Sequence, residues 1–188
     1  MDTPTGSTAC TRTERLDLRR PSTSELLELF KICNDPRVWT HYPSLRHTRQ
    51  AQTLAMIERW SQEWDADGLG TWTVRLINSD VVIGYGGCSL RQDTFWNLGY
   101  RFAADQHGHG YATELASEAF RQTGLLRPDL PVVAYLLEHN SASAHIARKL
   151  GLALVHRGPD VGNPDSSAVR LIYADRSLTE KQLTAIMR

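Results

Sequence analysis

The sequence predicts a mixed α/β domain of the α+β type, with a central, mostly antiparallel sheet flanked by helices. Three observations support this. Short turns join three consecutive strand-like segments, one unbroken apolar run has the composition of an interior strand, and segments with helical spacing separate the other strands. The chain has 188 residues, 41% apolar and 22% charged, which suffices for one domain with a buried core and is too apolar for a disordered chain.

The first third of the chain predicts one strand and two helices. Leucines alternate with charged residues over residues 14–20, which is the period of a strand with one solvated face. After a Pro-Ser-Thr-Ser break, residues 26–32 predict a helix that ends at Asn34-Asp35-Pro36. A second helix is expected over residues 48–67, where apolar residues recur at helical spacing. These are Leu54, Ile57, Trp60 and Trp64.

The rest of the chain predicts the sheet and its remaining helices. Residues 71–77, 81–90 and 94–102 are expected to form an antiparallel meander, because only short polar turns join them. The apolar run 132–137 predicts a strand buried on both faces. The remaining expected elements are helices at 110–123 and 141–150, strands at 152–156 and 168–173, a short helix from Thr179, and a loop at 158–167.

Charge and cysteine content exclude several classes of protein. The 21 basic and 21 acidic side chains cancel to a net charge of +0, which argues against a dedicated nucleic-acid binder. Cys10, Cys33 and Cys88 form no CxxC pair, as is usual in a reducing compartment. No apolar run is long enough to cross a membrane, and the polar N-terminus lacks the apolar core of a secretion signal. We therefore expect a cytoplasmic protein without membrane contact, in which residues 1–11 form a disordered leader and residues 12–188 a single domain.

A glycine-rich turn joins the predicted meander to the next helix. Gly108 and Gly110 stand just before that helix, where several backbone N–H groups lack helical partners at the positive end of the helix dipole. Such a turn can bind a phosphate or pyrophosphate, although an ordinary strand-to-helix turn can carry the same glycines. A P-loop would end in Gly-Lys-Ser/Thr, and a dinucleotide-binding turn would have a third glycine where this chain has Thr113. Both are therefore disfavoured.

A second motif, at residues 138–152, gives the turn its context. Residues 108–114 read Gly-His-Gly-Tyr-Ala-Thr-Glu, and an Asn-x-x-Ser pair and a Lys-x-Gly pair follow in the second motif. These pairs are Asn140 with Ser143 and Lys149 with Gly151. Together the two segments resemble the GNAT superfamily of acyl-CoA-dependent N-acyltransferases, and within it the RimJ/RimL-like branch. The resemblance covers about residues 12–174.

The resemblance implies the GNAT fold, in which splayed strands form the acyl-CoA cleft. It also implies direct acetyl transfer from acetyl-CoA to an amine, without a covalent enzyme intermediate. No pair of residues has the HxxxH spacing of a metal site, so no metal ion is expected. In the family, backbone amides of the turn, here between His107 and Thr113, bind the pyrophosphate, and an amide of the preceding strand polarises the thioester oxygen. The resemblance thus assigns these residues to acyl-CoA binding: Arg101, Phe102, Ala103, His107, Gly108, His109, Gly110, Tyr111, Ala112, Thr113, Asn140 and Ser143.

Asn140 and Ser143 are also the expected catalytic residues. By resemblance, Asn140 hydrogen-bonds the pantetheine, and Ser143 lies near the sulfur, where it can protonate or stabilise the thiolate. From the residues alone, Asn140 can instead be a helix N-cap and Ser143 a first-turn residue, and both roles can coexist. Many GNAT enzymes use a tyrosine seven residues after this asparagine as the acid. Ala147 occupies that position here, which favours Ser143.

The motifs leave the general base open. Members of the branch often carry a glutamate where this chain has Asn97, and an asparagine side chain cannot accept a proton at neutral pH. The role is therefore lost, served by an ordered water, or moved to another residue. The candidates by residue type are His41, His139, His156 and Glu138. His107 and His109 flank the turn and are expected to complement the charge of coenzyme A.

The acceptor is expected to be a primary amine, and the α-amine of a protein N-terminus is typical of the branch. A small-molecule amine, such as an antibiotic, a polyamine or an amino-acid derivative, is a second hypothesis. A non-catalytic acyl-CoA-binding module is a third, which Asn97 keeps open. The candidate acceptor surfaces are residues 39–45, the helix with Trp60 and Trp64, and the loop 158–167. Acyl-chain preference and the choice between monomer and homodimer stay open.

Overall fold

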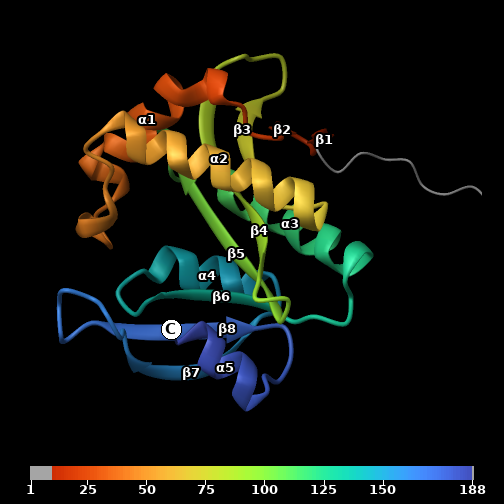
Figure 1. Ribbon diagram of the computed structural model, residues 1–188, viewed down its shortest axis with the longest axis vertical. Helices are drawn as coiled ribbons and strands as arrows, with labels where there is room; N and C mark the ends of the chain where they lie inside the picture. The colour runs from red at the N-terminus through yellow and green to blue at the C-terminus, as the bar shows by residue number, and fades with distance from the viewer. Residues whose placement is uncertain (1–9, 188) are drawn as a thin grey trace, which may run out of the picture.

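A computed structural model describes residues 10–187 and shows one eight-stranded sheet with helices on both faces (Figure 1). The strands are β1 (Cys10–Arg12), β2 (Leu16–Arg19), β3 (Thr71–Leu76), β4 (Val82–Arg91), β5 (Phe95–Phe102), β6 (Val132–Leu137), β7 (Ala153–Pro159) and β8 (Val169–Ala174). Their order across the sheet is β1-β2-β3-β4-β5-β6-β8-β7, and all neighbours run antiparallel except β5 and β6. The predicted mixed, mostly antiparallel sheet is confirmed.

The helices divide between the two faces of the sheet. They are α1 (Leu26–Asn34), α2 (Gln50–Asp67), α3 (Tyr111–Leu126), α4 (Ser141–Lys149) and α5 (Glu180–Ile186). Helices α1, α2 and α5 cover one face, and α3 and α4 cover the other (Figure 1). Successive side chains of β5 alternate between these faces. Arg101 contacts Trp39 on the α1–α2 side, and Phe102 lies against Tyr111 of α3.

Strands β5 and β6 pair at one end only. Trp96 pairs with Val132 and Asn97 with Val133, and these are the two pairs that join the strands within the described residues. Beyond them, β5 continues along β4 as far as Phe102, while β6 continues along β8. The sheet therefore opens between β5 and β6, which confirms the splay implied by the family resemblance.

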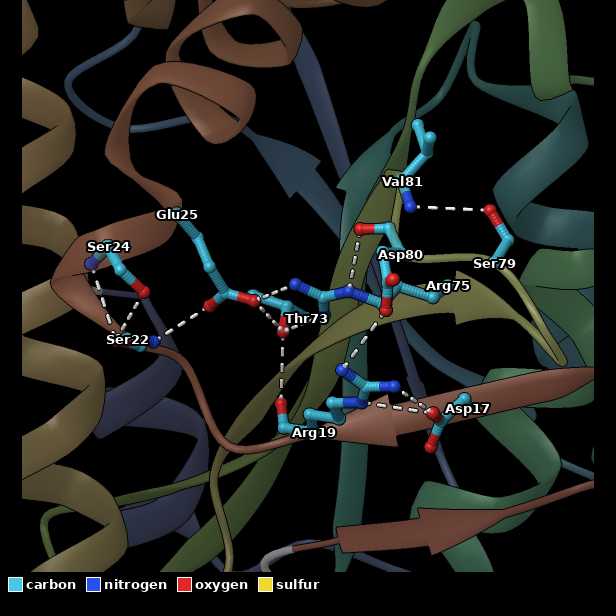
Figure 2. A network of polar contacts seen from close by, with 10 residues as sticks. All are labelled: Asp17, Arg19, Ser22, Ser24, Glu25, Thr73, Arg75, Ser79, Asp80 and Val81. Atoms are coloured by element: carbon cyan, nitrogen blue, oxygen red, sulfur yellow. Dashed lines mark hydrogen bonds and ion pairs between the residues drawn. The ribbon is translucent and has the colours of Figure 1, made fainter.

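A buried ion pair ties the start of α1 to the sheet (Figure 2). Arg75 on β3 binds Glu25, and both side chains are less than a tenth exposed. Thr73 donates to Glu25 Oε1 at 3.0 Å, and Arg75 Nε donates to the Asp80 carbonyl oxygen at 3.1 Å. Glu25 also accepts the Ser22 N–H at 2.7 Å within a capping box. The charge of Arg75 is thus neutralised inside the protein.

The sequence predictions need two corrections. Cys10 and Thr11, assigned above to the disordered leader, pair with Arg19 and Leu18 in β1, and residues 1–9 lie outside the described residues. Strand β1 has only three residues and no alternation of apolar and polar side chains, so the sequence pattern did not predict it. The second correction concerns β6, expected to be buried on both faces. Its Tyr135 is 41% exposed, beside the gap left by β5. Among residues 10–187, no helix is long and apolar enough to cross a membrane.

Candidate active site

The splay between β5 and β6 holds a cleft of about 940 Å³. Its walls come from β4, β5, β6, the loop after α1, and the first turns of α3 and α4. Most residues assigned to acyl-CoA line this cleft: Arg101, Phe102, His107, Gly108, Gly110, Tyr111, Ala112, Thr113, Asn140 and Ser143. Ala103 and His109 lie outside its lining. Two motifs that are far apart in sequence therefore meet in one cavity.

The glycine turn presents backbone donors at the start of α3. Gly108 and Gly110 both have a φ of +81°, a left-handed conformation that favours glycine. The N–H groups of residues 108–112 have no acceptor within the part of the chain that the structure describes. The two outer donors predicted above are engaged, because His107 donates to Ala104 O at 3.2 Å and Thr113 to Gly110 O at 3.1 Å. Fewer backbone N–H groups of the turn are therefore free to bind a ligand than the sequence predicted.

Arg15, the residue before β2, contacts this turn and helps to hold its conformation. Its Nη1 donates to the His109 carbonyl oxygen at 2.9 Å, its Nε donates to Glu114 Oε2 at 2.7 Å, and its guanidinium lies 4.9 Å from the Tyr111 ring centre. Burial opposes ionisation of Glu114, but the bonds from Thr13 and Arg15 hold the pKa of its carboxyl below the usual range. We did not predict this role of Arg15, because no local pattern in the sequence places it at the turn.

The two histidines of the turn contact its backbone. His109 stacks on Tyr111 with ring centres 5.4 Å apart and an angle of 8°, and its Nδ1 lies 3.0 Å from the His107 carbonyl oxygen. His107 Nε2 lies 3.1 Å from the Phe102 carbonyl oxygen. Each ring therefore has one nitrogen bonded to the backbone around the turn.

Strand β5 directs alternate N–H groups into the gap. Ala103 donates to Ile83 O on β4 at 2.9 Å, and Trp96 donates to Pro131 O beside β6 at 2.9 Å. Because N–H directions alternate along a strand, Phe102 turns its N–H toward the gap and Arg101 turns its own toward β4. Of the three strand residues predicted to polarise a thioester, Phe102 alone has an N–H that faces the cleft. The Ala103 N–H is already bonded and cannot take that role.

Helix α4 brings Asn140 and Ser143 to the same cleft. Asn140 Oδ1 accepts the Ser143 N–H at 3.1 Å, so the N-cap role of Asn140 is confirmed. The Ser143 hydroxyl lies beside the Tyr100 phenol from β5. Burial raises the pKa of Tyr100, and the Ser143 hydroxyl offsets part of that rise. Tyr100 was not predicted as a site residue. It lies two residues before Phe102 on β5, and side chains two residues apart on a strand point to the same face, so the sequence could have indicated it.

One of the four candidate bases faces the cleft. His41 lines it, and its ring centre lies 5.2 Å from that of His139. Burial, followed by the charges of His139 and Arg101, lowers the pKa of His41, so its ring is neutral at pH 7. Glu138 is paired with Arg157 at 2.7 Å, and this bond lowers its pKa. His156 lies outside the cleft lining, and its Nε2 is buried without a partner among the described residues.

A splayed sheet with an amide-rich turn at its cleft defines an acyltransferase of the GNAT fold. The sequence matches the acetyltransferase (GNAT) domain over residues 15–153, and the chain belongs to this family. It is therefore a GNAT acetyltransferase, a class of enzyme that uses acetyl-CoA without a metal ion.

The chain is also similar to several individual proteins. The uncharacterized protein YkkB of Bacillus subtilis strain 168 is 29% identical over 146 residues, which cover 74% of this chain and 83% of YkkB. The ribosomal L7/L12 α-N-protein acetyltransferase RimL, solved with coenzyme A, is 16% identical with a TM-score of 0.72 over 86% of this chain and 94% of RimL. The microcin C7 self-immunity acetyltransferase MccE, solved with acetyl-CoA and AMP, is 16% identical with a TM-score of 0.71 over 92% of this chain and 96% of MccE. At these identities the two structures show a shared fold.

Proposed function

We propose that this protein transfers the acetyl group of acetyl-CoA directly to a primary amine. The observation that carries the proposal is the set of open N–H groups, from residues 108–112 and from Phe102, along one cleft. Acetyl-CoA has an acceptor for both parts of this set. Its pyrophosphate can accept from the amides of residues 108–112, and its thioester carbonyl can accept from the Phe102 N–H. The residues present fit this ligand, since a Cβ at Gly108 would meet no atom within 4 Å and the turn is open.

The donor is held by backbone groups in this proposal. The amides of residues 108–112 bind the pyrophosphate at the positive end of α3, which explains how a chain of net charge +0 can bind a strongly anionic ligand. Asn140 can donate from its Nδ2 to the pantetheine while its Oδ1 caps α4. The pantetheine would then run through the splay toward Phe102.

The side chains of the cleft supply the proton transfers. The neutral amine attacks the thioester carbon, and the Phe102 N–H stabilises the charge that develops on the carbonyl oxygen. His41, neutral at pH 7, accepts the proton that the amine loses. The C–S bond then breaks, and the Ser143 hydroxyl donates a proton to the leaving thiolate. Tyr100, kept protonated by burial, lies where it can return a proton to Ser143.

The α-amine of a protein N-terminus remains our first hypothesis for the acceptor. RimL, whose fold this chain shares, is described as an α-N-protein acetyltransferase. A small-molecule amine is the second hypothesis, because MccE has the same fold and was solved with AMP beside acetyl-CoA. Both acceptors present the same primary amine to His41, so the mechanism above serves either.

The proposal is tested by incubating the protein with acetyl-CoA and a panel of N-terminal peptides and small amines. We expect thiol release that depends on the amine, together with an acetylated product in the mass spectrum. Ser143→Ala should lower kcat about tenfold or more while the affinity for coenzyme A changes little, as expected for a proton donor. Tight coenzyme A binding without turnover on any amine would instead support the non-catalytic module.

A further inference from the structure

We infer that Arg101 binds an anionic group of the acceptor, so that the substrate is a primary amine with a carboxylate or phosphate close to it. The inference rests on the proposed function and adds the chemical class of the acceptor. It starts from the position of Arg101 within the cleft and from the lack of a negative partner for its charge.

Arg101 lies on the face of the sheet opposite the glycine turn. Its Nη1 donates to the Val38 carbonyl oxygen at 2.8 Å, and its guanidinium lies 3.5 Å from the centre of the Trp39 ring. Both residues belong to the loop after α1 and pack in one cluster with residues of α1 and α2. The open amides of residues 108–112 begin α3, on the other face. Arg101 is therefore on the acceptor side rather than beside the pyrophosphate.

The other arginines of the cleft all have carboxylate partners. Arg37 pairs with Asp35 and Asp105, Arg91 with Glu63, and Arg170 with Asp160. Arg101 has no carboxylate within 4.0 Å among residues 10–187. Lys149 also lines the cleft without such a partner, but it is exposed, and water solvates its charge.

The groups around Arg101 do not compensate its charge. Those whose pKa it influences are Cys33, Tyr85, His41 and His47. Burial raises the pKa of the thiol and the phenol and lowers the pKa of both imidazoles, so all four side chains are neutral at pH 7. A partly buried cation among neutral groups is costly unless an anion joins it.

The guanidinium is held so that it can receive such an anion. Stacking on Trp39 and the bond to Val38 fix its plane. The Tyr85 hydroxyl is a further partner. None of the guanidinium nitrogen atoms is both buried and unpartnered, so any that lacks a partner is accessible, and Arg101 lines the cleft. A fixed guanidinium can bind a carboxylate or phosphate through two parallel hydrogen bonds, which also fixes the orientation of the acceptor.

The anchor also delivers the amine to the candidate base. His41, whose pKa Arg101 helps to lower, lines the same cleft and can receive the proton of the amine. Binding of the anion and delivery of the amine to His41 are thus expected to depend on one residue.

The experiment uses acceptors in matched pairs that differ in one anionic group. The pairs are free amino acids with their amides, peptides with Asp or Asn as the second residue, and phosphoethanolamine with ethanolamine. We expect at least one anionic member to exceed its neutral partner roughly tenfold or more in kcat/KM, as a charged hydrogen-bonded pair would give. The pair that responds identifies the source of the anion as a small molecule, a peptide or a phosphate ester.

Variants of Arg101 decide whether this residue is responsible. Arg101→Gln should bring the ratio of kcat/KM between the anionic and neutral acceptors close to one. Arg101→Lys should keep part of the preference, because lysine retains the charge but lacks the planar guanidinium that forms two parallel hydrogen bonds. Arg121→Gln removes an exposed arginine on α3 and should keep the full preference. A preference that survives in Arg101→Gln, or neutral acceptors that react equally well in the wild type, would overturn the inference.

Failure of the inference can be told from failure of the proposed function. Acetylation of amines without any anion preference contradicts the role of Arg101 alone. If no amine is acetylated, equilibrium binding of the same pairs to the protein with coenzyme A gives the answer. Equal affinity for anionic and neutral members would then overturn the role of Arg101 as well. Thermal unfolding and coenzyme A affinity of each variant show whether it is folded.

Discussion

Two arginines on the same face of the sheet have opposite surroundings. Arg75 on β3 is buried and bound by Glu25, Thr73 and the Asp80 carbonyl, so its charge is neutralised by the protein (Figure 2). Arg101 on β5 contacts the Val38 carbonyl oxygen, the Tyr85 hydroxyl and the Trp39 ring, and among residues 10–187 it has no carboxylate partner. The first arrangement stabilises the fold, because both charges are compensated. The second leaves a charge for a ligand to compensate.

The helix N-termini show the same contrast. Helix α4 is capped by Asn140 and α5 by Thr179, each of which accepts a backbone N–H of the first turn. Helix α3 has Gly110 at its N-cap, which has no side chain to offer, and its first N–H groups stay open to the cleft. The α4 cap also lies at the cleft, so the difference is that α3 leaves backbone donors for a ligand whereas α4 and α5 bind one of theirs. Loss of a satisfied group is expected to affect stability, and loss of an open group is expected to affect binding.

The largest expected effect is on stability, at the Arg75 network. Glu25→Gln keeps the shape of the side chain but leaves Arg75 buried without a counter-charge. We expect it to lower the free energy of unfolding by about 3–5 kcal/mol, as for one partner lost from a buried pair. Arg101→Gln should cost less than about 1 kcal/mol, because no ion pair is broken. Urea unfolding of both variants measures the difference.

A double variant controls for simple loss of packing at this site. Replacing Glu25 with Leu and Arg75 with Met removes both charges together and should recover most of the stability that Glu25→Gln loses. Equal losses in Glu25→Gln and Arg101→Gln would contradict the distinction between the two arginines.

The second effect is on donor binding, at the open amides. Gly110→Asp adds a negative charge to the turn, with a Cβ 3.5 Å from Arg15 Nη2, and places a side chain at a φ of +81°. We expect coenzyme A affinity to fall about a hundredfold or more, measured by calorimetry. Gly124→Asp adds the same charge near the far end of α3, where a Cβ would meet no atom within 4 Å, and should bind coenzyme A like the wild type. Unchanged binding by Gly110→Asp would contradict the proposed donor site.

The parts of the molecule that could be predicted depend on local patterns. Short polar turns predict the meander, and helical spacing predicts α2 to within two residues of its start. The glycines at 108 and 110 mark the turn because its backbone conformation needs them. The two motifs then carry the family resemblance. Each of these signals lies within a stretch of the chain short enough to be read directly.

The parts that could not be predicted depend on contacts between distant segments. Arg15 and Glu114 are 99 residues apart, and nothing near either residue shows that they meet at the turn. The missing partner of Arg101 is visible only once all carboxylates are placed around the cleft. The exposure of Tyr135 likewise follows from β5 turning away from β6, which the apolar run 132–137 does not reveal.

The smallest expected effect is on pH dependence, where the cleft's charges act on His41. As a base, His41 must be neutral, so kcat/KM should fall as pH drops through its pKa, which lies below 6.5. His139→Gln removes one of the two charged groups that lower this pKa. The pH at which kcat/KM falls on the acid side, the acid limb of the profile, should therefore rise by a few tenths of a pH unit. Comparing the variants on one acceptor cancels the acceptor's own titration. His145→Gln, on the α4 wall of the same cleft, should leave the limb in place. A limb that does not move in His139→Gln would mean that a group other than His41 accepts the proton.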